Sequence, residues 1–167
     1  MNLDKCLNMT KILFICHGNI CRSPMAEFIM KHLAAQAGRA TDFEIASAAV
    51  STEEIGNDIY PPAKRMLASK GVPFERRAAR QMTRSDYAYY DHIVCMDQSN
   101  LRWMKYIIGE DSDHKVSLMM AWTIPNVQSP ISNIGSVPDV SDPWYTGDFT
   151  KAYDDILEGC QAMLKQI

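Results

Sequence analysis

The sequence predicts an α/β fold, a single domain built on a four-stranded parallel sheet with helices on both faces. Short apolar runs alternate with segments of helical periodicity along the chain, which is typical of strand–helix–strand units. The run at 11–15 is continuous, as expected for a strand that is covered on both faces. With 167 residues and 47% hydrophobic content, the chain is long enough to bury one core.

The strands are predicted at the short apolar runs 11–15, 43–48, 92–96 and 116–120. After the first strand and a polar segment, Pro24 is expected to open a helix in its favoured first position. Gly38 is expected to close that helix, whose buried stripe consists of Met25, Phe28, Ile29 and Leu33.

The rest of the chain continues the alternation, with helices predicted over 62–69 and 149–164. Thr83 and Asp86 form the pattern of a capping box for a short helix, and Ser99 is expected to cap another. Segment 123–142 is rich in proline, serine and asparagine and has no periodicity. It is therefore interpreted as a long loop over the functional site.

The charge pattern argues against nucleic acid as a partner, because the net charge is −3. No run approaches the roughly 18 apolar residues of a membrane span, and the polar start with Asp4 does not resemble a secretory signal. We expect a cytoplasmic protein with an N-terminal extension (1–9) ahead of one domain (10–167). A local run of arginines is interpreted as a solvated face: Arg76, Arg77, Arg80 and Arg84.

The cysteines indicate reduced thiols rather than a disulfide framework. There are five, an odd number, and no pair forms a Cys-x-x-Cys motif. The four histidines lie far apart in the sequence, so no metal site and no cofactor are expected.

The junction between the first strand and its helix carries the chemistry. Five residues separate Cys16 from Arg22, and a loop of this length can turn its backbone N–H groups toward a phosphate. The same N–H groups and the helix dipole favour the thiolate of Cys16, while Arg22 can bind two phosphate oxygens. Gly18 is expected to adopt a positive φ, and Asn19 can tolerate the left-handed region. The alternative is a buried cysteine near a surface arginine.

Four motifs, in order, resemble the low-molecular-weight protein tyrosine phosphatases: FICHGNICRSPMAE at 14–27, ARQMT at 79–83, CMDQSNL at 95–101 and DPWY at 142–145. The resemblance covers the chain from about residue 10 to the end. It implies the phosphotyrosine phosphatase I-like fold, a flavodoxin-like doubly wound arrangement. It also implies a phosphate-binding loop formed by His17, Gly18, Asn19, Ile20, Cys21, Arg22 and Ser23.

The resemblance assigns roles that the residues alone do not. Asp142 matches the general acid, although an aspartate there is by itself as well explained as a turn former. Trp144 and Tyr145 match the rim that stacks on the substrate ring, with ordinary core aromatics as the alternative. Ser23 matches a hydroxyl that stabilises the thiolate, and a helix N-cap is an equally good interpretation. Cys21 matches a second loop cysteine able to form a disulfide with the nucleophile; the alternative is a small packing residue.

Three departures from the family pattern concern the surroundings of the loop. Ser-Ala-Ala-Val stands at 47–50 in place of Ser-Ala-Gly-Thr. Glu53 and Glu54 replace the aromatic residue or histidine that often forms the substrate wall, and Arg77 replaces a histidine that supports the loop asparagine. The segment 123–142 is also longer than usual. We expect these differences to affect substrate preference rather than reaction type.

The predicted function is hydrolysis of phosphotyrosine, and of small aryl phosphates, through a cysteinyl-phosphate intermediate with Cys16 as nucleophile. The expected partner is a phosphotyrosine-containing protein, and the chain is expected to act as a monomer. One alternative is an arsenate reductase on the same fold, which would need a close pair of late cysteines, whereas Cys95 and Cys160 stand alone. The other alternative is a phosphopeptide-binding module without turnover.

Overall fold

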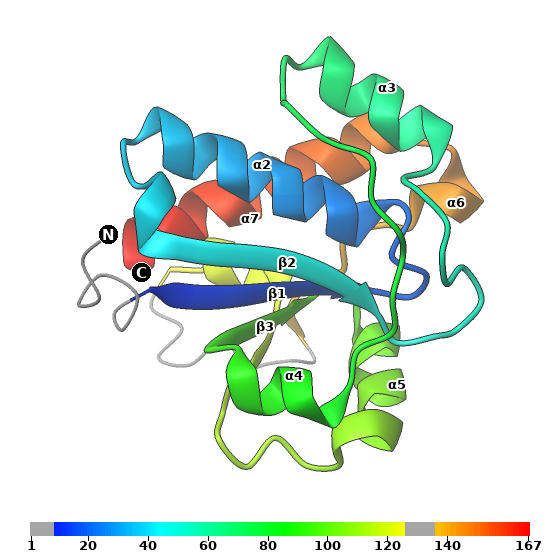
Figure 1. Ribbon diagram of the computed structural model, residues 1–167, viewed down its shortest axis with the longest axis vertical. Coiled ribbons are helices and arrows are strands. Elements are labelled where there is room, and N and C mark those ends of the chain that lie inside the picture. Colours follow the sequence, from blue (N-terminus) through cyan, green and yellow to red (C-terminus); the bar gives the residue numbers. More distant parts are fainter. Residues whose placement is uncertain (1–8, 126–135) are drawn as a thin grey trace.

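The computed structural model describes residues 9–125 and 136–167. Its centre is a parallel sheet of four strands in the order β2-β1-β3-β4 (Figure 1). The strands are β1 (Thr10–Cys16), β2 (Phe43–Ala49), β3 (His92–Cys95) and β4 (Val116–Leu118). The predicted sheet is confirmed.

Helices cover both faces of the sheet, as expected for a parallel sheet. One face carries α2 (Arg22–Gln36), α3 (Pro61–Ser69) and α7 (Phe149–Gln166), and the other carries α4 (Arg84–Tyr89) and α5 (Gln98–Ile108) (Figure 1). The short elements are η1 (Ala40–Asp42), η2 (Met119–Thr123) and α6 (Pro143–Thr146).

The central strand β1 lies in the core and ends at the site. Its residues Ile12, Leu13, Phe14 and Ile15 are all 0% exposed, so both of its faces are packed. Ile15 pairs with Ala48 on one side and with Cys95 on the other. The carboxyl ends of these three strands therefore meet at one edge, where open parallel sheets bind ligands. Cys16 is the last residue of β1 and lies at that edge.

Two predicted helix starts are wrong. Helix α2 begins at Arg22, with Cys21 as N-cap, so Pro24 occupies its third position, where a missing backbone N–H still costs no intrahelical bond. Helix α5 is capped by Asp97 rather than by Ser99, because the Asp97 carboxylate accepts a bond from the Asn100 amide (2.8 Å). The capping box of Thr83 on α4 is confirmed.

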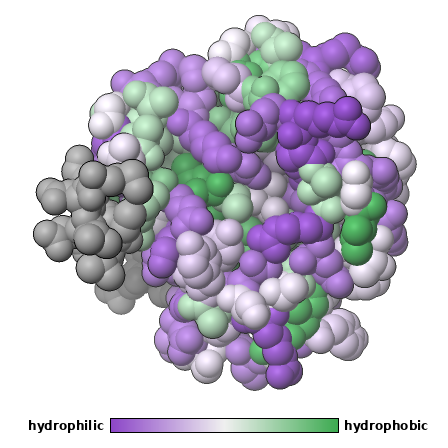
Figure 2. Space-filling model, in the orientation of Figure 1, coloured by the Kyte–Doolittle hydropathy of each residue, from purple (hydrophilic) through white to green (hydrophobic). Residues whose placement is uncertain are grey.

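The last predicted strand is shorter than expected, because the backbone turns into η2 after Leu118. Of the predicted loop 123–142, residues 126–135 lie outside the described residues, as do residues 1–8 of the predicted extension. In the described parts of the chain, no helix is long and apolar enough to cross a membrane. The visible surface is mostly hydrophilic, with hydrophobic residues in separate small patches (Figure 2).

Candidate active site

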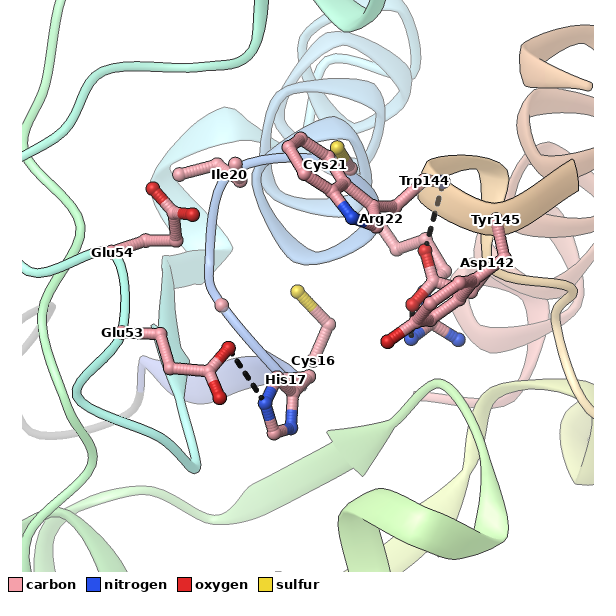
Figure 3. Close-up of a pocket in the computed structure, with 11 residues that line it drawn as sticks. Cys16, His17, Ile20, Cys21, Arg22, Glu53, Glu54, Asp142, Trp144 and Tyr145 are labelled. Carbon is pink, nitrogen blue, oxygen red and sulfur yellow. Dashed lines mark hydrogen bonds and ion pairs between the residues drawn. The ribbon is translucent and has the colours of Figure 1, made fainter. Parts of the chain in front are cut away.

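A pocket of about 70 Å³ opens at the carboxyl edge of the sheet (Figure 3). Three separate segments build it: the phosphate loop (residues 16–22), the acidic wall (Glu53 and Glu54), and the segment from Asp142 to Tyr145. The side chains that the sequence predicted for the site are therefore brought together. Its lining comprises Cys16, His17, Gly18, Ile20, Cys21, Arg22, Glu53, Glu54, Asp142, Trp144 and Tyr145.

The thiol of Cys16 lies at the base of this pocket and is 4% exposed. The backbone N–H of Asn19 donates to Cys16 Sγ at 3.3 Å, and Ser23 Oγ lies 3.1 Å from the same sulfur. Helix α2 begins at Arg22, so its positive end faces the loop. An N–H donor, a hydroxyl group and a positive helix end therefore surround this sulfur.

Ser23 is not a helix N-cap. The N-cap position of α2 is Cys21, and no side chain caps this helix. The Ser23 hydroxyl instead contacts Cys16 Sγ and accepts a hydrogen bond from Asn19 Nδ2 at 2.8 Å. Of the two interpretations of Ser23, only contact with the thiol fits the geometry.

Asn19 adopts the left-handed conformation, with φ of 61°, and its side chain fixes the turn. Its Nδ2 also donates to Ser47 Oγ at 2.9 Å, and its Oδ1 accepts a bond from the Arg80 amide at 3.2 Å. Ser47 Oγ donates in turn to Glu27 Oε1 at 2.7 Å. A buried chain of hydrogen bonds thus connects helix α2 and strand β2 to the loop, which keeps the loop rigid.

Gly18 does not adopt the positive φ that the sequence suggested, because it is absent from the positive-φ glycines of the described chain. Its lack of a side chain favours close packing instead. A Cβ at this position would lie 3.2 Å from Glu54 Cγ, which is tighter than ordinary van der Waals contact. The absence of a side chain lets the acidic wall lie directly against the phosphate loop.

Arg77 and Arg80 are not part of a purely solvated face, because both are half-buried. The Arg77 guanidinium donates to the Asn19 carbonyl and, at 3.2 Å, to the Asn57 carbonyl. Burial lowers the pKa of Arg77. Arg80 forms a two-bond ion pair with Asp86, at 2.9 and 3.1 Å. Arg77 therefore supports the backbone of the phosphate loop.

The Arg22 guanidinium is 2% exposed and is oriented by three acceptors. Its Nη1 donates to Asp97 Oδ2 (2.7 Å) and to the Val140 carbonyl (2.8 Å), and its Nη2 donates to Asp142 Oδ2 (3.1 Å). Burial opposes its charge, but the negative charges of Cys16, Asp97 and Asp142 raise the pKa of Arg22 overall.

A guanidinium has five N–H donors. Three of them are used by Asp97, Val140 and Asp142. Nε–H and the second Nη2–H have no hydrogen-bond acceptor within the described chain, and they share one edge of the guanidinium. That edge can bind two oxygens of a phosphate side by side.

Asp142 lies at the pocket mouth beside this arginine. It caps α6, and its Oδ1 accepts a bond from the Trp144 amide at 3.1 Å. Trp144 and Tyr145 are 53% and 83% exposed, so they are rim residues rather than core aromatics. The Trp144 ring packs on Tyr60, with ring centroids 5.0 Å apart.

Cys21 is a buried free thiol that packs with Ile20 and Ala79. Burial, followed by the negative charge of Cys16, raises the pKa of Cys21 to about 12. Of the two loop thiols, Cys21 therefore stays protonated at neutral pH.

Comparison with known proteins places this pocket in a defined family. The family model "Low molecular weight phosphotyrosine protein phosphatase" matches residues 11–167. The chain belongs to that family. Its activity is that of a protein-tyrosine-phosphatase, and phosphotyrosine is the substrate group that the family implies.

Individual relatives agree over nearly the whole chain. The low molecular weight protein-tyrosine-phosphatase YfkJ of Bacillus subtilis is 31% identical, over 95% of this chain and 96% of its own. The phosphatase of Rattus norvegicus is 34% identical, over 93% of this chain and 94% of its own. The YfkJ crystal structure aligns with a TM-score of 0.84 over 95% of this chain and 94% of that one. The crystal structure of the Streptococcus pyogenes enzyme SP-PTP aligns with a TM-score of 0.79 at 32% identity. This alignment covers 95% of this chain and 93% of that one.

Several contact residues of the site were not predicted from the sequence. Asp97 and Val140 orient Arg22, and Glu27 and Ser47 support Asn19. One sequence signal pointed to Asp97: it lies two residues beyond the end of strand β3, and polar residues at the carboxyl ends of adjacent parallel strands gather at one edge. Val140 acts through its backbone, which no sequence pattern reveals.

Proposed function

We propose that Cys16 is the nucleophile, Arg22 the phosphate-binding cation and Asp142 the general acid of phosphotyrosine hydrolysis. In the first step the Cys16 thiolate attacks phosphorus, the S–P bond forms and the P–O bond to tyrosine breaks. Asp142 gives its proton to the leaving phenolate oxygen. The loop amides and the free edge of Arg22 bind the equatorial oxygens, where negative charge develops.

The second step releases phosphate and restores the enzyme. The Asp142 carboxylate takes a proton from water, the water oxygen attacks the cysteinyl-phosphate, and the S–P bond breaks. Phosphate leaves with the new oxygen, and Cys16 returns to the thiolate. Because Asp142 must be protonated in the first step and ionised in the second, a bell-shaped pH profile is expected.

The observation that carries this proposal is the convergence of one sulfur, one guanidinium edge and one carboxylate on a single pocket. An assay of para-nitrophenyl phosphate hydrolysis tests it. Activity that survives EDTA, together with loss of turnover in Cys16→Ser, is the expected result. Rapid quenching of Asp142→Ala during turnover of an aryl phosphate with a very acidic phenol should trap phosphate on Cys16. Full activity of Cys16→Ser would overturn the assignment.

The remaining proposals concern the working form of the protein. We propose that it acts on phosphotyrosine-containing proteins as a cytoplasmic monomer, and the odd cysteine count suits a reducing compartment. The domain is proposed to comprise 10–167, with 1–9 as a dispensable extension; the family match from residue 11 supports this. Size-exclusion chromatography and the activity of a chain lacking residues 1–9 test these points.

A further inference from the structure

The acidic wall is attached to the phosphate loop at both ends. Before it, Ser51 donates to the His17 carbonyl from its backbone N–H (3.1 Å) and its hydroxyl (2.9 Å). After it, the Tyr60 amide donates to the Ile20 carbonyl at 2.9 Å. The backbone on both sides of the acidic wall is therefore tied to the phosphate loop.

The two glutamates differ in how their charge is compensated. Glu53 Oε2 lies 3.2 Å from His17 Nε2, and the His17 ring packs edge-on against Trp103. Glu54 accepts a bond from the neutral amide of Asn57 at 2.6 Å, and no ion pair involves it within the described residues. Glu54 thus presents a net negative charge, whereas Glu53 has a partner that can carry positive charge.

Glu54 is partly enclosed by its neighbours. It is half-buried, its stem lies against Gly18, and its carboxylate is bound by Asn57. Figure 3 shows the acidic wall on one side of the Cys16 thiol and the rings of Trp144 and Tyr145 on the other. A tyrosine ring that enters between them brings the neighbouring residues of its peptide close to Glu54.

A fixed carboxylate beside a phosphate-binding loop disfavours an anionic substrate unless the substrate supplies a positive charge nearby. We propose that Glu54 is a specificity-determining residue that selects phosphotyrosine flanked by lysine or arginine. The inference rests on the function proposed above. In this arrangement the loop and Arg22 bind the phosphate, Trp144 and Tyr145 contact the phenyl ring, and Glu54 pairs with the flanking cation.

The test uses synthetic phosphotyrosine peptides of equal length that carry Lys, Gln or Glu beside the phosphotyrosine. For each enzyme variant, kcat/KM for the Lys peptide is divided by kcat/KM for the Glu peptide. This ratio cancels any general effect of a substitution on turnover. For the wild-type chain at low salt we expect a ratio on the order of 5, as for one exposed ion pair, that falls in 0.5 M NaCl because of screening.

Glu54→Gln should bring the ratio close to one, and Glu54→Lys should reverse it. Glu53→Gln should change it less, because His17 already pairs with Glu53. Glu75→Gln is the matched control: Glu75 is exposed and lies outside the pocket lining, so the ratio should stay at the wild-type value.

An unchanged ratio in both Glu54 variants would overturn the proposal, and so would an equal fall in Glu75→Gln, which would indicate net charge alone. Failure of the underlying function gives a different result, since the wild-type chain would then not hydrolyse the Gln peptide or para-nitrophenyl phosphate.

Discussion

Replacing Asp97 tests how the phosphate-binding arginine is oriented. Asp97 has two tasks: its Oδ1 caps α5 through the Asn100 amide (2.8 Å), and its Oδ2 accepts from Arg22 Nη1 (2.7 Å). Asp97→Ser keeps a side chain that can cap the helix but is too short to reach Arg22. Asp97→Ala loses both interactions. The difference between the two variants therefore separates helix capping from arginine orientation.

The magnitudes follow from the two contacts. A hydrogen bond to a charged group contributes about 1.5–3 kcal/mol, and this one is well shielded, with Arg22 2% and Asp97 14% exposed. Loss of an N-cap costs about 1 kcal/mol. We expect the free energy of unfolding to fall by about 2 kcal/mol in Asp97→Ser and by about 3 kcal/mol in Asp97→Ala.

Activity should fall together with stability, because a displaced guanidinium no longer matches the phosphate. A loss of about 10²-fold in kcat/KM is expected for both variants, as for small misplacements of a positioning group. Urea unfolding and para-nitrophenyl phosphate kinetics measure the two effects. Asp139→Ser is the control, because Asp139 accepts a bond from the Gln98 amide (3.0 Å) at the same helix start and is not among the acceptors of Arg22.

Two outcomes would refute this reasoning. If Asp97→Ser keeps wild-type kcat/KM and stability, Asp97 does not orient Arg22. If Asp139→Ser loses as much activity as Asp97→Ser, the effect comes from negative charge near the site rather than from the direct contact.

Three further predictions concern the acid, the loop thiols and pH. Asp142→Ala should lower kcat by about 10²–10⁴, and by less for aryl phosphates with acidic phenols; an equal loss across leaving groups would assign it another role. Peroxide should oxidise Cys16 first, and the oxidised Cys16 should then form a disulfide with Cys21 that peptide mapping detects. After peroxide treatment, Cys21→Ser should not recover its activity with dithiothreitol. Full recovery of this variant would make Cys21 a packing residue only. Although burial opposes it, the Lys64 hydrogen bond lowers the pKa of Asp58 to about 2 from 3.8. The contribution of Asp58 to the free energy of unfolding should therefore fall as the pH drops from about 4 to about 2. Acid unfolding of Asp58→Asn should lack this pH dependence.

The sequence alone determined the features that are local in the chain. The continuous apolar run of β1 specifies a strand buried on both faces, and the spacing from Cys16 to Arg22 specifies a loop that can surround a phosphate. The left-handed turn at Asn19 is equally local, because few residue types other than glycine tolerate it. Such features depend on backbone sterics and on neighbours a few residues away, so a single sequence encodes them directly.

Only the tertiary structure decided what surrounds that loop. Two of the three acceptors that orient Arg22 come from Asp97 and Asp142, which are 75 and 120 residues away in the sequence. The motif resemblance gave Asp142 a role but not its contact with Arg22, and it gave Asp97 neither. The stem of Glu54, which reaches Gly18 from another segment, leaves little room for a side chain there. Such contacts depend on which strand ends become neighbours in the sheet and on where each connecting segment returns, and neither leaves a periodic pattern in the sequence.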